Sequence, residues 1–175
     1  MQPVDLLTCT SPPALHIVEM SADSFANLAR SLAASDACAV VRTIRGHKSR
    51  TVVTFFDESA AALQFPPYFG ENWNAFDEMI VDLDWLAGDA YLLLVADAEL
   101  LLVDADAEDF RILADIWSRA RLEWLTPNQY IPRHRRVTPF HVLLQTTNDA
   151  STSALTRRLS LVGAAFDRVV ARSES

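Results

Sequence analysis

Apolar residues recur along this chain with two different periods, and each period predicts a type of element. Recurrence every three to four residues predicts helices, while short runs that are β-branched or apolar throughout predict strands. Helices are expected near 22–34, 51–63, 70–83 and 107–124, and along an apolar stripe from 155 to 169. Strands are expected at 38–44, 90–96 and 140–145, with a short peripheral strand at 14–20.

The order of these elements predicts an α/β fold. At least one helix separates each core strand from the next, and parallel strands require such long crossovers. The run AYLLLVA at 90–96 is apolar at nearly every position, which suits a central strand that is covered on both faces. We expect a small three-stranded parallel sheet flanked by helices, with extra helices at the termini.

Three parts are expected along the chain. Residues 1–37 form an N-terminal arm with room for a strand and a helix, residues 38–146 form the α/β domain, and residues 147–175 form a C-terminal helical extension. With 175 residues, of which 50% are hydrophobic, the chain is long enough for one substantial core. The terminal helix is expected to cover the sheet edge or to contact a second subunit.

Charge is distributed unevenly. Residues 51–110 contain fourteen Asp and Glu residues and no Lys or Arg, in a chain whose formal net charge is −8. Such a surface suits a partner with a cationic cleft and disfavours direct binding of nucleic acid, which requires a basic stripe. The small basic runs are expected to be solvated loops. These are Arg42, Arg45, Lys48 and Arg50, and Arg133, Arg135 and Arg136.

Cysteine content and hydropathy indicate where the protein resides. Cys9 and Cys38 are the only two cysteines and lie far apart, so neither a disulfide framework nor a close-set zinc site is expected. Cys38 begins the strand predicted at 38–44 and is expected to be a small buried residue. No stretch approaches the roughly 18 apolar residues of a membrane span. We expect a cytoplasmic protein that binds no membrane.

Signatures of enzymes and of bound cofactors are weak, and no cofactor, metal ion or catalytic residue is expected. Asp104 and Asp106 imitate the start of a calcium loop, but Asp109 stands where that loop requires Gly. Four singly scattered glycines supply no phosphate-binding turn. His141 lies beside an apolar run and is expected to be a hydrogen-bonded structural residue. A deep pocket lined by His134 or His141 would favour a small-molecule enzyme instead.

The segment FPPYFGENWNAF lies in the middle of the acidic stretch and leads into an amphipathic helix. Trp73 and Phe76 share one arc of that helix with other apolar residues, so they are expected to belong to the core. Asn74 and Glu78 fall on the opposite arc, which is acidic. One face of the helix therefore packs, and the other is expected to face solvent or a partner.

The residues just before this helix are expected to shape a loop. Tyr68 and Phe69 adjoin each other, so one is expected to pack while the other is exposed. Gly70 marks a backbone position that a side chain would crowd. Glu71 and Asn72 are expected to brace the loop and the first helical turn.

Residues 63–86, read as LQFPPYFGENWNAFDEMIVDLDWL, resemble the signature of the barstar family, small intracellular inhibitors of barnase-type ribonucleases. The shared features are a proline, an aromatic pair, Gly-Glu-Asn, and an amphipathic helix with an acidic residue where the family places Asp. The order of elements over roughly residues 38–146 also resembles that family's three-stranded parallel sheet. The terminal elements resemble additions found in longer barstar-like proteins.

The resemblance implies a partner-binding surface. In that family, the motif helix and the loop before it fill the ribonuclease active site with carboxylates, which stand where substrate phosphate would lie. Tyr68 matches the aromatic that packs on the enzyme, and Asn74 matches the first inhibitory Asp without its charge. Asp77 matches an aromatic contact residue. Glu78 matches the central inhibitory Asp and carries its charge one methylene further out.

The sequence therefore supports two alternative hypotheses about function. The first is non-catalytic inhibition of a barnase-type ribonuclease through Tyr68, Asn74, Asp77 and Glu78, with a basic protein as the partner. The alternative is a barstar-fold interaction module that does not inhibit a ribonuclease. Such a module would bind another basic protein or pair with itself through the C-terminal helix, and the departures at Asn74 and Asp77 favour it.

Overall fold

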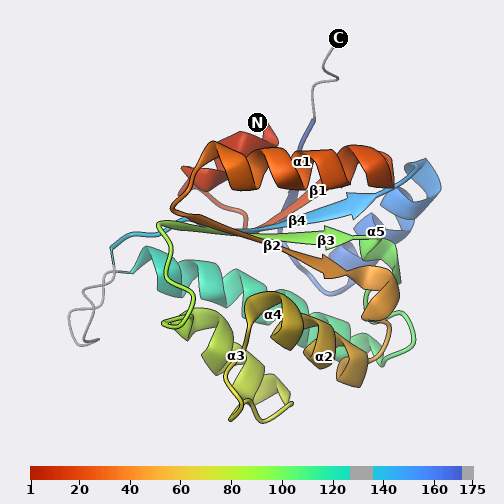
Figure 1. Ribbon diagram of the computed structural model, residues 1–175. Helices are drawn as coiled ribbons and strands as arrows, with labels where there is room; N and C mark the ends of the chain where they lie inside the picture. Colours follow the sequence, from red (N-terminus) through yellow and green to blue (C-terminus); the bar gives the residue numbers. More distant parts are fainter. Residues whose placement is uncertain (127–135, 171–175) are drawn as a thin grey trace.

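The computed structural model describes residues 1–126 and 136–170, and within them one parallel β-sheet carries helices on both faces (Figure 1). Five strands are hydrogen-bonded in the order β2-β3-β4-β1-β5, and every neighbouring pair is parallel. Their bounds are Leu15–Glu19 for β1, Ala39–Arg45 for β2, Ala90–Ala96 for β3, Phe140–Thr146 for β4 and Phe166–Arg168 for β5. The expected α/β class is confirmed.

The expected number of three strands is wrong, because the terminal parts of the chain supply two more. β1 lies between β4 and β5, with Leu15 opposite Val142 on one side and Phe166 on the other. Four of its five residues are buried, so this strand is an inner part of the sheet and not peripheral. With five strands, the middle position belongs to β4 and not to β3.

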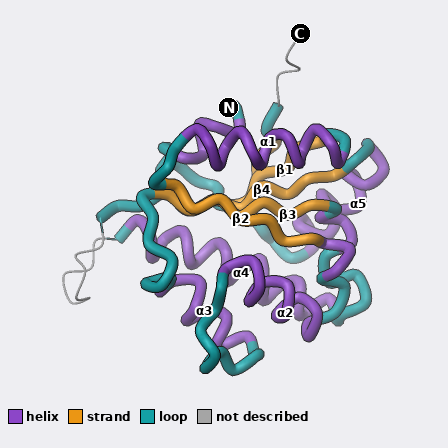
Figure 2. Tube along the Cα trace, viewed as in Figure 1, coloured by secondary structure: helices purple, strands orange, loops and turns teal. Residues whose placement is uncertain are grey.

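Helices cover the two faces of the sheet in separate layers (Figure 2). One face carries α1 (Ala22–Ser35) together with the short 3-10 helix at Pro3–Leu7. The other face carries α2 (Val52–Leu63), α3 (Trp73–Asp82) and α4 (Ala107–Leu125), and the core on that side also includes residues of α5 (Asp149–Leu161). The layer with α3 and α4 therefore lies across the sheet from α1.

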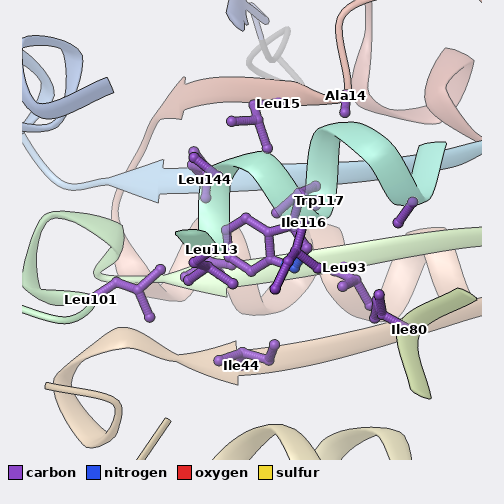
Figure 3. Packing of buried hydrophobic residues seen from close by; sticks show 14 of the residues in the cluster. Ala14, Leu15, Ile44, Ile80, Leu93, Leu101, Leu113, Ile116, Trp117 and Leu144 are labelled. Carbon is purple, nitrogen blue, oxygen red and sulfur yellow. The ribbon is translucent and has the colours of Figure 1, made fainter. Parts of the chain in front are cut away.

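The apolar run of β3 divides between two cores, which explains why it has no polar positions. Leu92 and Leu94 pack in the cluster beneath α1, while Leu93 and Val95 pack in the larger cluster on the opposite face. Successive side chains of a strand point to opposite faces, so a strand covered on both sides requires apolar residues throughout. In the larger cluster, Trp117 of α4 lies against the sheet near Leu93 (Figure 3).

Side-chain caps and one close backbone approach fix the ends of several elements. Ser21 and Thr51 each accept a hydrogen bond from the amide three residues onward, which satisfies a free N–H at the start of α1 and of α2. Gly46 follows β2 directly. A Cβ there would lie 2.2 Å from the carbonyl oxygen of Asp97, so only glycine fits at this position.

Two further expectations from the sequence are wrong. The apolar stripe from 155 to 169 is not one helix, because α5 ends at Leu161 and β5 follows it. Gly163 adopts a φ of 72°, which turns the chain out of the helix and allows Phe166 to pair with Leu15. Cys38 is exposed and not buried, since it lies in the turn before β2.

Candidate functional site

Aromatic packing holds the loop that connects α2 to α3. The ring of Phe69 packs on the rings of Phe56 and Phe65, at centroid distances of 5.7 and 4.9 Å. The neighbouring Tyr68 is 70% exposed. The prediction that one of the two adjacent aromatics packs while the other is exposed is confirmed. An exposed Tyr on an anchored loop presents a large contact area whose position is fixed.

Asn72 sets the start of α3, so the helix begins at Trp73 and not at Gly70. The Oδ1 of Asn72 accepts a hydrogen bond from the amide of Ala75 at 2.9 Å, and its Nδ2 donates to the carbonyl of Gly70 at 3.0 Å. A Cβ at Gly70 would lie 3.1 Å from that same Nδ2. Glu71 shapes the turn through its backbone, with a φ of 48°, while its side chain is exposed. The bracing role expected of Asn72 is confirmed.

The inner face of α3 is fixed by packing and by one hydrogen bond. Phe76 is fully buried, and its ring lies edge-on to that of Phe55 at a centroid distance of 5.1 Å. Trp73 is half-buried and packs on Phe56, and its Nε1 donates to Oδ1 of Asp109 on α4 at 2.9 Å. The helix therefore has a defined rotation about its axis, which determines the residues it presents outward.

Two predicted contact residues, Asn74 and Glu78, lie exposed on the outer face of α3, one helical turn apart. Neither side chain makes a hydrogen bond or an ion pair with another residue within the described ranges 1–126 and 136–170. The carboxylate of Glu78 is therefore available to a partner. Asn74 adds an amide that both accepts and donates, but it adds no charge.

Asp77 lies in a different environment from Glu78. Its Oδ2 accepts a hydrogen bond from Nη1 of Arg119 on α4 at 2.9 Å, and the two form an ion pair. The Arg119 side chain is 59% exposed and that of Asp77 is 30% exposed. One of the four predicted contact residues is thus already ion-paired with a cation of the chain itself.

An open groove of about 240 Å³ lies between α3 and α4, which run side by side on the same face of the sheet (Figure 1). Its lining combines three carboxylates, one guanidinium and two apolar side chains, from Asp77, Glu78, Val81, Arg119, Leu122 and Glu123. The groove thus brings Asp77 and Glu78 together. Tyr68 and Asn74 are not among its lining residues.

Arginines of the chain itself pair with several acids of the stretch 51–110. Arg45 hydrogen-bonds to Glu58, and this interaction is the main cause of the lowered pKa of that carboxyl. Arg50 does the same to Asp104, whose pKa is also lowered. Both arginines are ion-paired, whereas solvated loops were expected from the sequence. Free negative charge is therefore concentrated in fewer places than the composition implies.

The contribution of α4 to the groove was not anticipated from the sequence. The apolar period of this helix places Phe110, Leu113 and Trp117 inward, and all three are buried. The same period leaves Arg119 and Leu122 outward, and an outward Leu is the one signal that this face differs from ordinary solvated surface. Which neighbour the outward face meets depends on interhelical packing, which the period does not encode.

His141 has the structural role expected of it. Its Nδ1 lies 2.9 Å from Nε2 of His16, and its Nε2 lies 2.8 Å from the carbonyl oxygen of Cys9. Both rings are fully buried. His134 lies outside the described residues. Among residues 1–126 and 136–170, no group of three or more His, Cys, Asp and Glu is placed to hold a metal ion, and no helix is long and apolar enough to cross a bilayer.

Solved structures with a similar fold include two of the ORC2 protein of Aeropyrum pernix. The ADP form is 15% identical, with a TM-score of 0.59, and the match covers 94% of this chain and 44% of that one. The structure with ADPNP-ADP complexes is 12% identical, with a TM-score of 0.56, and the match covers 94% and 43%. This chain spans less than half the length of either, and the likeness shows the fold alone.

Comparison with curated proteins gives no match. A family model described as Barstar (barnase inhibitor) matches residues 39–145. That range is more than half of the chain, and it runs from the start of β2 nearly to the end of β4, so it includes the anchored loop, α3 and the groove. The chain belongs to the barstar family.

Proposed function

We propose that this protein is a non-catalytic inhibitor of a barnase-type ribonuclease, and that α3 and the loop before it enter the basic cleft of that enzyme. The observation that carries the proposal is the free carboxylate of Glu78 on a helix whose other face is packed by Phe76. Because packing fixes the helix, only the side chain of Glu78 has to be ordered when its carboxylate takes the place of a substrate phosphate. Family membership supports the ribonuclease as the partner.

Each predicted contact residue has a distinct part in this proposal. Glu78 supplies the charge that replaces a phosphate among the enzyme's cations. Tyr68 supplies apolar contact area beside the cleft, and Asn74 supplies hydrogen bonds one turn from Glu78. Asp77 shares its charge with Arg119, so it adds less attraction than a free carboxylate. No step of this function requires a cofactor or a catalytic residue.

Charge reversal at Glu78 tests the proposal. We expect Glu78→Lys to raise the inhibition constant for a barnase-type ribonuclease about 30-fold or more, because it places a cation against cations. The matched control is Asp167→Lys, which makes the same change of charge at an exposed residue of the edge strand β5. Inhibition that falls equally in both variants would show a general charge effect and contradict a specific role for Glu78.

The nucleotides named with the ORC2 structures are not proposed as ligands. Only Met20 and Ser21 link β1 to α1, and phosphate binding at this point of a parallel sheet requires a glycine-rich turn.

The cytoplasm is the proposed location, because Cys9 and Cys38 are both free and disulfides persist mainly outside that compartment.

A second candidate function is an interaction module without ribonuclease inhibition. The ion pair of Asp77 and the uncharged Asn74 favour it, since they leave Glu78 as the one free carboxylate among the four predicted contact residues. Leu161, at the end of α5, is 77% exposed and offers a contact for a second copy. If the chain pairs with itself there, sedimentation should show a dimer that Leu161→Glu dissociates. A protein that stays monomeric at all accessible concentrations would contradict self-association.

A further inference from the structure

Arg119 is a cation on a surface whose proposed partner is cationic. Its Nη1 donates to Asp77 at 2.9 Å, and its side chain is 59% exposed in the groove that Glu78 and Glu123 also line. A guanidinium has five N–H donors, and this hydrogen bond uses one of them. Its remaining donors hydrogen-bond to no other residue among 1–126 and 136–170, so they are open to a partner.

The ion pair between Asp77 and Arg119 is expected to contribute little to the stability of the fold. Pairs with exposed partners contribute little to folding, because solvent screens them and ordering two side chains costs entropy. The effect on binding is different, because a partner excludes that solvent. A cation placed against Arg119 would then be repelled, whereas a carboxylate placed there would accept charge-assisted hydrogen bonds.

The rest of the groove indicates what else the partner presents. Glu78 and Glu123 lie on the two helices that flank it, and Val81 and Leu122 add apolar side chains to its lining. Long basic side chains suit such a lining, since their methylene stems cover apolar surface while the charged ends reach carboxylates. The groove thus fits basic side chains with an acidic one beside them.

We infer that Arg119 is a specificity-determining residue of the proposed inhibitory surface. It selects a partner whose basic cleft carries an acidic side chain opposite Arg119, and it disfavours a cleft that is basic throughout. This inference rests on the proposed function and narrows it to a subclass of partners. Arg119 acts through direct contact with the partner and not through the fold.

The first test uses barnase as the probe. We expect Arg119→Gln to inhibit barnase about tenfold more tightly than the unchanged protein, since the variant removes the repelling cation and frees Asp77. The matched control is Arg111→Gln on the same helix, which removes the same charge from a residue paired with Glu108 and Asp115. Equal inhibition by the Arg119→Gln and Arg111→Gln variants would overturn the inference and leave the proposed function intact.

A second test decides the inference if no version of the chain inhibits barnase, which would be a failure of the proposed function. The probes are an oligo-arginine peptide and a matched peptide in which some arginines are replaced by aspartate. The ratio of the affinity for the mixed peptide to the affinity for oligo-arginine should be higher in the unchanged protein than in Arg119→Gln. The same preference in Arg119→Gln and in Arg111→Gln would overturn the inference, because net charge alone would then explain binding.

Discussion

Replacing Phe76 with Ala is expected to lower the free energy of unfolding by about 3–5 kcal/mol. Phe76 is fully buried, and its ring contacts those of Phe55, Phe65 and Trp73 at centroid distances of 5.1, 6.0 and 6.2 Å. The substitution removes this contact area and leaves a cavity that rings of this size cannot fill. A single domain has only about 5–15 kcal/mol of stability, so the loss is a large part of the total.

Urea denaturation measures this effect, and the midpoint should fall with little change in the m-value. The matched control is Tyr68→Ala, which truncates an aromatic residue that lies five positions before Trp73 and is 70% exposed. Stability should change by about 0.5 kcal/mol or less in that variant, while binding to a ribonuclease should weaken. A Phe76→Ala protein as stable as the Tyr68→Ala protein would contradict the packing described for α3.

Acidification below pH 6.5 is expected to destabilise the fold through the buried histidine pair. Burial is the main cause that lowers the pKa of His16 to about 4, and burial likewise lowers the pKa of His141. Arg121 also opposes a proton on both rings, and its guanidinium, largely buried, donates to the carbonyl of Thr10. The carbonyl of Cys9 accepts from Nε2 of His141, so in the neutral pair Nδ1 of His141 accepts from Nε2 of His16.

The direction follows from proton counting. The unfolded chain binds protons at these histidines from about pH 6.5, while the folded chain binds them only at lower pH, so stability is lost as the pH falls between the two pKa values. For His16 alone the loss from pH 6.5 to about 4 is on the order of 3 kcal/mol. Paired carboxylates such as Glu58 lose their contribution at lower pH, because their pKa values are below the usual range.

Denaturation between pH 7 and 5 isolates the histidine effect. The unfolding free energy should fall with a slope that His141→Gln reduces, because that variant removes one buried titrating ring and restores some solvent to the other. His47→Gln is the matched control, since His47 is exposed and paired with Asp97. An unfolding free energy that stays constant over this range in the unchanged protein would contradict neutral burial of the pair.

Local signals in the sequence predicted most of the fold. Periodicity and caps located α1, α2 and α4 to within one or two residues, because each of these helices buries a regular stripe. β1 was placed at the edge because pairing is non-local, since its partner β4 lies more than a hundred residues downstream. β5 is three residues long, too short for any period, and Phe166 continues the spacing of α5 by coincidence. Gly163 was the available signal that the helix ends.

The outer face of α3 could also be predicted, but its electrostatics could not. The helical period placed Asn74 and Glu78 outward, and both are exposed. The period did not predict that Arg119, 42 positions after Asp77, would pair with that carboxylate. Ion pairs between helices depend on interaxial distance and rotation, and the pattern within either helix contains neither.

The central claim, that Glu78 enters a cationic cleft, is tested most directly by double-mutant cycles. Glu78→Gln would be combined with substitution of each active-site Arg or Lys of a barnase-type ribonuclease by Ala, and the binding free energies compared. Close charge pairs in the barnase–barstar complex itself couple by about 1.5–7 kcal/mol, and we predict at least the lower end of that range for one enzyme cation. Free energies that add to within about 0.5 kcal/mol for every cation tested would contradict the claim.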